Sequence, residues 1–232
     1  MNEIQKLFTK KFNSMLTAHG FKLTAGVFHR ATTGKMIQIV GLLYNPMYFT
    51  LHYINIPLCS GLKLFPDIEG THIGELFGAN EAALLCPTDE TIVERGLEDL
   101  HKICRLMLIP HLEKVCNYKT FCDYVILKDK IQNILLKSIE FNGYRQLKYP
   151  GFCEASMTLG DFDYPQLAFD NLTECYGLFG SRLGDTWKNR YDDLDNLLKA
   201  HKCNNNNFIF ENIKMKEEST LESYKQTFAA VS

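Results

Sequence analysis

The sequence predicts an α+β protein, in which an N-terminal helix and an antiparallel meander of three or more strands packed on helices precede a mostly helical C-terminal half. Three observations support this fold class. Apolar residues recur every three or four positions in 2–19, as on one face of a helix. They form short, strand-like runs from there to about residue 58. After residue 124 they return to helical spacing. Hydrophobic residues make up 46% of the 232 residues and charged residues 22%, as in an ordinary globular chain.

The first expected element is an amphipathic helix over 2–19. Its apolar positions share one helical face: Ile4, Leu7, Phe8, Phe12, Met15 and Leu16. Gly20 follows where a left-handed residue commonly ends a helix. Lys6 and Lys10 fall on the other side, which we interpret as a solvated face.

Three strands are expected next, over 21–30, 35–44 and 48–58. Both connections are short and carry turn residues, which favours antiparallel neighbours because parallel strands need a long crossover. The second strand is apolar on both faces and therefore suits a central position. Pro57 should end the third strand or mark a sheet edge.

Residues 60–88 leave two alternatives open. Glycines and prolines punctuate the segment, which is typical of a long loop, and loops of this length are often functional. The same residues could instead contain short strands near 72–77 and 82–86.

A helix is expected over 89–115, with one apolar stripe along it. The stripe comprises Val93, Gly96, Leu97, Leu100, Ile103, Cys104, Met107 and Leu108. Pro110 lacks a backbone N–H and should end or kink this helix.

The second half is expected to be helical, with 142–153 as a connection or a short strand. Its predicted helices span 124–140, 164–180, 185–202 and 208–228. The clearest change in composition lies near 117–123. We therefore expect an α+β domain over 1–123 with a helical region packed on it over 124–232, or one continuous domain.

Charge and cysteine content narrow the class of protein. The formal net charge is −2, so the chain lacks the excess of cations needed for bulk binding of nucleic acid or of an anionic membrane. No stretch of 18 apolar residues and no apolar N-terminal leader is present, so we expect a cytoplasmic protein that does not enter the membrane. The eight cysteines are then expected to be reduced thiols, because disulfides are rare in the cytoplasm.

One short pattern suggests a family. Gly20-Phe21-Lys22 follows the first helix, Phe28-His29-Arg30 ends the first strand, Ile37-Gln38 lies in the second, and Phe49-Thr50 opens the third. This pattern resembles a bacterial domain-of-unknown-function family over about the first quarter of the chain. Leu23-Thr24-Ala25 departs from it, because the family tends to be basic there, and His52 and Ile54 stand near the family's asparagine.

The resemblance implies an α+β fold that begins helix, strand, strand, strand. It implies no reaction, because none is established for that family. Some related bacterial families are immunity proteins for secreted toxins, which suggests a binding role by analogy of fold alone.

Possible metal ligands occur on the helix expected over 89–115. His101 and Cys104 stand three residues apart, and His111 and Cys116 follow. Cys104 also belongs to the apolar stripe, and Pro110 separates the second pair from the first. We therefore interpret these residues as a core cysteine with boundary histidines, and we expect no metal and no cofactor.

Other polar motifs also have simple structural interpretations. Asp161 and Asp163 resemble a cation-binding pair, but they precede a helix and are expected to cap it. Asp192, Asp193 and Asp195 are expected on a solvated helical face. The glycine-rich stretch 177–184 lacks the strand and Lys-Ser/Thr ending of a phosphate-binding loop, so we interpret it as a turn. No G-x-S-x-G nucleophile motif is present.

The remaining candidate is a surface formed by the sheet and the 60–88 segment. Its predicted members are Arg30, Tyr48, His52, Tyr53, Asp67, Glu69 and His72. Tyrosine, arginine and histidine suit partner recognition because each combines a large contact area with a polar tip.

Three functions stay open at this point. The first is a cytoplasmic, non-catalytic protein that binds another protein, as an immunity protein does. The second is an enzyme with a hydrolase-like site, in which His52 or His72 acts as a base oriented by Asp67 or Glu69. The third is a binder of a small ligand in a pocket lined by phenylalanines and tyrosines.

Overall fold

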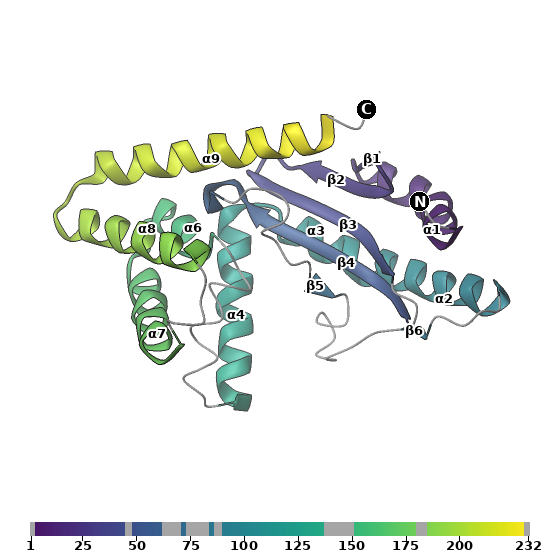
Figure 1. Cartoon of the computed structure of the whole chain (residues 1–232), viewed down its shortest axis with the longest axis horizontal. Coiled ribbons are helices and arrows are strands. Elements are labelled where there is room, and N and C mark those ends of the chain that lie inside the picture. The colour runs from purple at the N-terminus through teal and green to yellow at the C-terminus, as the bar shows by residue number, and fades with distance from the viewer. Residues whose placement is uncertain are drawn as a thin grey trace. The chain divides into compact units, whose positions relative to one another are not determined.

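The computed structural model describes residues 3–44, 48–61, 71–72, 84–85, 90–136, 151–179 and 185–229 (Figure 1). It confirms the α+β class, with an N-terminal helix, an antiparallel sheet and a mostly helical remainder. The elements are α1 (Glu3–Ala18), β1 (Lys22–Thr24), β2 (Val27–Ala31), β3 (Met36–Tyr44), β4 (Tyr48–Pro57), the 3-10 turn η1 (Leu58–Ser60), β5 (Thr71–His72), β6 (Leu84–Leu85), α2 (Glu90–Ile103), the π-helical turn η3 (Cys104–Leu108), α3 (Ile109–Lys114), α4 (Tyr118–Leu136), α6 (Phe152–Thr158), α7 (Asp163–Phe179), α8 (Asp185–Lys202) and α9 (Asn206–Ala229).

The chain divides into two compact units. Unit 1 comprises 1–55, 65–116 and 224–232, and unit 2 comprises 56–64 and 117–223. The division falls within β4 and within α9, so both units contain residues that are far apart in the sequence. The division into 1–123 and 124–232 stays a prediction.

Unit 1 is built on the sheet, whose strands follow the order β1-β2-β3-β4-β5, with β6 also paired to β4. The first predicted strand, 21–30, is in fact a hairpin of β1 and β2. Ala25 and Gly26 form its two-residue turn, with φ of 51° and 84°. Positive φ at both positions is the type I′ geometry that suits a hairpin, but it usually has Asn or Asp before the glycine, so the sequence signal was weak.

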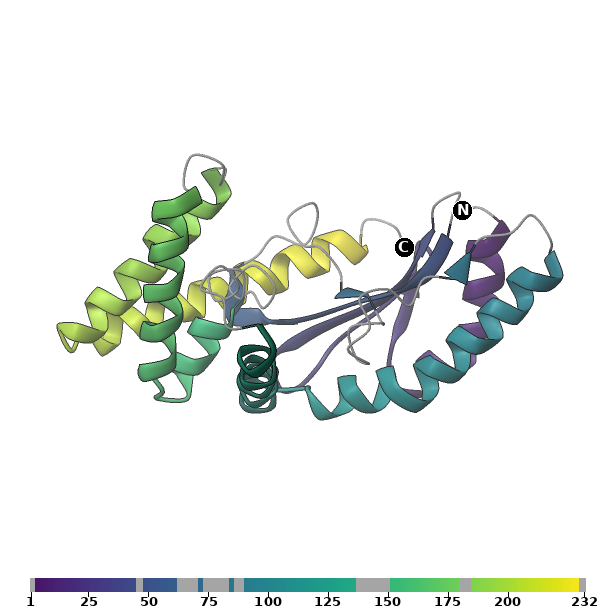
Figure 2. The same cartoon turned by 90° about the horizontal axis from the view of Figure 1, so that it is seen from below.

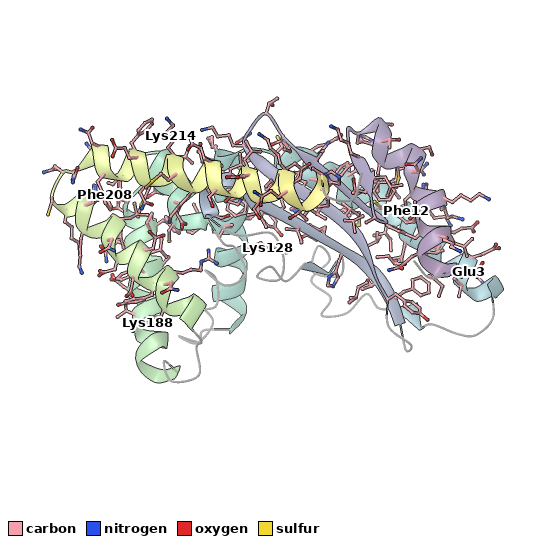
Figure 3. The ribbon with its side chains drawn as sticks, turned by 45° about the horizontal axis from the view of Figure 1, so that its top comes forward. Glu3, Phe12, Lys128, Lys188, Phe208 and Lys214 are labelled. Atoms are coloured by element: carbon pink, nitrogen blue, oxygen red, sulfur yellow. The ribbon has the colours of Figure 1, made fainter. Side chains whose placement is uncertain are left out.

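One face of the sheet packs against α1, α2 and the turns that follow α2 (Figure 2). Phe8, Phe12 and Leu16 of α1 are fully buried, which confirms the predicted apolar face. Phe12 lies among these side chains in Figure 3, where Glu3 marks the exposed start of the same helix. Phe28 of β2 belongs to the same core.

The expected single stripe along 89–115 is interrupted by η3. The N–H of Ile109 bonds the carbonyl of Cys104, five residues back, so this turn holds one residue more than an α-helical turn. The extra residue keeps Ile109 and Leu112 on the core face but leaves Met107 exposed, contrary to the predicted stripe. Pro110 does not end the helix: it lies in the first turn of α3, where its missing N–H is tolerated.

Unit 2 contains α4, α6, α7, α8 and the part of α9 up to residue 223. The helix α4 begins at Tyr118, earlier than the expected residue 124. Asn117 caps this helix, because its Oδ1 accepts a hydrogen bond from the N–H of Thr120 at 3.0 Å. The short helix α6 was not predicted: it begins in the last two residues of the expected connection over 142–153 and continues to Thr158. Asp161 Oδ1 accepts from the N–H of Tyr164 at 3.3 Å, which confirms its capping role.

In the 60–88 segment, β5 and β6 favour the interpretation with short strands. Both pair antiparallel with β4, with His52 opposite His72 and Tyr48 opposite Leu85. Most of the rest of the segment lies outside the described residues. Across the described helices, none is both long enough and apolar enough to cross a membrane.

Candidate functional site

The predicted surface is only partly visible. Asp67 and Glu69 lie outside the described residues, and the side chains of Tyr48 and His72 are not described. Tyr53 is 4% exposed and its ring packs edge-on against His111, so this side chain belongs to the core of unit 1. His52 precedes it in β4 and points to the opposite face of the sheet, because side chains alternate along a strand. The side chains of His52 and Tyr53 therefore lie on opposite faces of the sheet. The surface as a whole stays a prediction.

Arg30 of β2 is engaged within unit 1. Its Nε donates to Oε1 of Gln38 at 2.7 Å, and its Nη1 donates to the carbonyl of His19 just after α1. The guanidinium carbon lies 4.4 Å from the centre of the Phe21 ring. Arg30 therefore closes the C-terminal end of α1 against the sheet.

Gln38 of β3 completes the same network from a fully buried position. Its Nε2 donates to the carbonyls of Leu112 at 2.7 Å and Val115 at 3.2 Å, at the end of α3. Asn55 also donates to the Val115 carbonyl, at 2.8 Å. These contacts satisfy carbonyls that the helix end leaves without partners. Phe21, Arg30 and Gln38, which carry the family resemblance, thus have a structural role.

His29 is buried on the opposite face of the sheet. Its Nδ1 lies 2.7 Å from the Tyr224 hydroxyl, and its Nε2 lies 2.9 Å from Oγ1 of Thr24. Its ring stacks on Phe228 at 3.7 Å with an interplanar angle of 11°. Burial, with a smaller contribution from Lys22, lowers the pKa of His29. Nδ1 thus bonds a residue in the last turns of α9 and Nε2 bonds a residue of β1, so both ring nitrogens are engaged within the fold.

The placement of His101, Cys104 and His111 agrees with the core cysteine and boundary histidines expected from the sequence. Cys104 is buried in the core, and burial raises the pKa of its thiol to about 12. His101 packs edge-on against Phe12, and His111 packs against Tyr53. No group of three possible ligands gathers among the residues that the structure describes.

Unit 2 contains a buried ionic cluster that the sequence analysis missed. Lys216 of α9, 12% exposed, bonds Oε1 of Glu154 in α6 at 3.0 Å and also pairs with Asp193 of α8. The Glu154 side chain is 3% exposed, and its Oε2 has no hydrogen-bond partner among the residues that the structure describes. Burial works to lower the pKa of Lys216, but the two carboxylates outweigh it and the net direction is upward. Asp193 is therefore engaged in the fold rather than on a purely solvated face.

A second group of polar atoms lies close to this cluster. The Tyr118 hydroxyl donates to Oε1 of Glu217 at 2.9 Å and accepts from the N–H of Cys59 at 3.0 Å. Burial and nearby Glu154 raise the pKa of the Cys59 thiol well above its ordinary value. A thiol held protonated in this way is a poor nucleophile. The group joins η1, α4 and α9 and contains no activated residue.

Unit 1 also has an open groove between α1 and α2. It has a volume of about 310 Å³ and is lined by Leu7, Lys10, Lys11, Glu94 and Leu97. Lys11 pairs with Glu98 at 3.2 Å across the two helices. Its lining therefore combines two leucines with three charged side chains.

Large apolar side chains are exposed at several described positions, and two groups of them are close together in the sequence. Leu106 and Met107 of η3 are 66% and 38% exposed. Phe208, Phe210 and Met215 are exposed along the first half of α9, where Figure 3 labels Phe208 and Lys214. Single exposed apolar residues are common, but neighbouring ones mark candidate interaction surfaces.

Two sequence signals could have found these features. Lys216 stands on the apolar face of α9, at helical spacing from the buried Ile213 and Thr220, and a lysine there needs a buried partner. Leu106 stands off the core stripe of its helix, where a charged residue is usual. Neither signal identifies the contacting residue, because the partners of Lys216 lie 62 and 23 positions away in the sequence.

Comparison with known proteins finds no matching family model, no matching curated protein and no matching solved structure.

Proposed function

We propose that this chain is a cytoplasmic, non-catalytic protein that binds another protein. The observation that carries the proposal is the exposure of Leu106 and Met107, two neighbouring apolar side chains, on a π-helical turn. Burying apolar surface is the main favourable contribution to protein association, and π-helical turns occur frequently at functional sites.

The polar side chains described above support this proposal, because they already bond other residues of the fold. Arg30 and Gln38 close helix ends, His29 holds α9, and Lys216 pairs with two carboxylates. The buried thiols of Cys59 and Cys104 have raised pKa values, which disfavours the reactive thiolate. Each of these described groups therefore has a structural task.

The state of the described cysteines agrees with a reducing compartment. In the part of the chain where side chains are described, six of them are thiols rather than disulfides: Cys59, Cys104, Cys116, Cys122, Cys153 and Cys203. Four of the six are buried, as expected of small apolar core residues.

The test is the isolation of a defined complex. A tagged chain is used to capture proteins from the cells that produce it, and the captured protein is then made separately and mixed with the purified chain. We expect a complex of fixed stoichiometry in size-exclusion chromatography with light scattering. The absence of a complex, together with turnover in a screen of hydrolase substrates, would overturn the proposal. A toxin-like gene beside this one would favour an immunity role.

The groove between α1 and α2 favours a second candidate, a binder of a small ligand. Its volume is near the lower limit for ligand pockets, about 300 Å³. A ligand that binds the folded chain must raise its melting temperature. A compound that does so for the wild type but not for Leu7→Trp, in which the new side chain fills the groove, would support this candidate.

The enzyme hypothesis depends on residues that lie mainly outside the described part of the chain. Of its four residues, only the side chain of His52 is described. It stays a hypothesis.

A further inference from the structure

The exposed surface of η3 extends into the first turn of α3. We define the π-turn patch as Leu106, Met107 and Pro110, all of which are exposed. Leu106 and Pro110 are four residues apart and therefore lie on the same side of the helix. The patch is thus a continuous apolar surface rather than three separate side chains.

The fold cannot bury this patch by a local adjustment. Cys104, Leu108 and Leu112 already occupy the core face and are fully buried. The π-helical geometry brings Ile109 into the core, and it leaves Leu106 and Met107 directed away from it. No described part of the fold covers them, which leaves them available to a partner.

Some charged side chains around the patch have partners among the described residues of the chain, and others do not. Lys102 pairs with Asp99 at 3.4 Å, and Glu113 is hydrogen-bonded to His19, a neutral residue in the charge count, at 2.6 Å. Arg105 and Lys114 are exposed, and neither makes an ion pair with any residue that the structure describes. Arg105 adjoins Leu106 in the chain, and Lys114 stands four residues after Pro110 on the same side of α3. Arg105 and Lys114 together outweigh the charge of Glu113, so the net charge beside the patch is positive.

We propose that the π-turn patch docks an acidic segment of a partner protein. An apolar side chain of that segment covers Leu106 and Met107, and its carboxylates pair with Arg105 and Lys114. Arginine is enriched among residues that dominate binding energy, and the flexible Met107 side chain can adapt to the shape of its partner. This inference rests on the proposed function and adds the surface and the chemistry of the partner.

The observations favour a protein over nucleic acid or membrane. Two free cations neutralise few phosphates, and the net charge of the chain is −2. The exposed centre of the patch is apolar, as in the core of a protein interface with a polar rim.

The test uses four matched peptides and the full-length chain labelled at its methyl groups. The first peptide has one phenylalanine between glutamates, the second has lysines in place of the glutamates, the third has alanine in place of the phenylalanine, and the fourth has both changes. We expect only the first to shift the NMR signals of Leu106 and Met107. Its binding should weaken with added salt, because rim charges are screened.

Variants locate the contact on the chain. Leu106→Ser and the double change R105E with K114E should each weaken binding of the first peptide by about tenfold or more. Leu127→Ser is the control, because Leu127 of α4 is 55% exposed and belongs to the other unit. It should leave binding unchanged.

Three outcomes would overturn the inference. The first is binding of the lysine peptide as well as the glutamate peptide, or no shift at Leu106 with either. The second is attachment to anionic phospholipid vesicles that Leu106→Ser abolishes. The third is a homodimer that the same change dissociates. If the partner isolated above binds the Leu106→Ser and R105E/K114E variants as tightly as the wild type, this surface is wrong while the proposed function stands.

Discussion

Gly151 occupies a position where neither the backbone nor the available space admits a side chain. Its φ is +86°, in the left-handed region, and a Cβ there would lie 2.6 Å from Cγ of Pro57 and 2.8 Å from Cβ of Ser60. Gly160 has a similar φ of +77° but no atom within 4 Å of such a Cβ. Both glycines belong to unit 2, so the pair separates the effect of conformation from that of packing.

We expect Gly151→Ala to destabilise the protein more than Gly160→Ala. Both changes carry the cost of a left-handed alanine, about 1–2 kcal/mol. Only Gly151→Ala also overpacks its surroundings, which typically adds about 1–3 kcal/mol. Urea unfolding of the two variants measures the difference. Equal losses of stability would contradict the close packing between Gly151 and η1.

At the scale of elements, Lys216 connects three helices of unit 2. It lies on α9 and pairs with Glu154 of α6 and Asp193 of α8. A buried ion pair is not necessarily better than an apolar contact, but removing one partner leaves the other charge buried and unpaired. The cluster therefore specifies how the helices of this unit pack.

We expect Lys216→Met to lower the free energy of unfolding by about 3–5 kcal/mol, because Glu154 loses its buried partner. The double variant Lys216→Met with Glu154→Gln should recover part of that loss, since it removes the isolated charge. A double-mutant cycle in urea measures the coupling between the two residues. A loss below about 1 kcal/mol in the single variant, as is usual for a surface ion pair, would show that the cluster is solvated.

At the scale of the whole molecule, residues from both ends of the chain meet in unit 1. Tyr224 and Phe228 of α9 hold the ring of His29 in β2. The pKa of His29 lies below its ordinary value of 6.5, because burial disfavours the charged ring and Lys22 repels it. The unfolded chain therefore takes up this proton at a higher pH than the folded protein does.

We expect the stability contributed by His29 to be complete above about pH 6.5 and to decline as the pH falls from there toward its pKa in the folded protein. NMR titration of the ring measures the pKa directly. Hydrogen exchange near pH 5 should be faster in β2 and the last turns of α9 than near pH 7.5, after correction for intrinsic rates. In His29→Gln this additional pH dependence should vanish. A ring pKa at or above 6.5 would contradict the prediction.

The accuracy of the sequence predictions depends on how local each feature is. The bounds of α1, β3, α8 and most of α9 follow from periodicity and end signals, which neighbouring residues supply. The hairpin was missed because Ala25 stands where Asn or Asp usually precedes the glycine, and the π-helical turn was missed because one extra residue in a helix leaves no clear signal in the apolar spacing. For the candidate site, Arg30 was recognised as a residue of interest, but its partners were not.

The sequence by itself determined the α+β class, the order of most elements and the absence of a strong net charge, because these follow from composition and from apolar spacing within short windows. The tertiary structure decided which side chains are buried or paired within the fold and which are exposed for contact with another molecule. It placed Tyr53 in the core, tied Arg30 and Gln38 to helix ends, paired Lys216 with Glu154 and left Leu106 exposed. The physical reason is that burial and pairing are set by contacts between residues far apart in the chain, and no local pattern records which distant residue fills a given space.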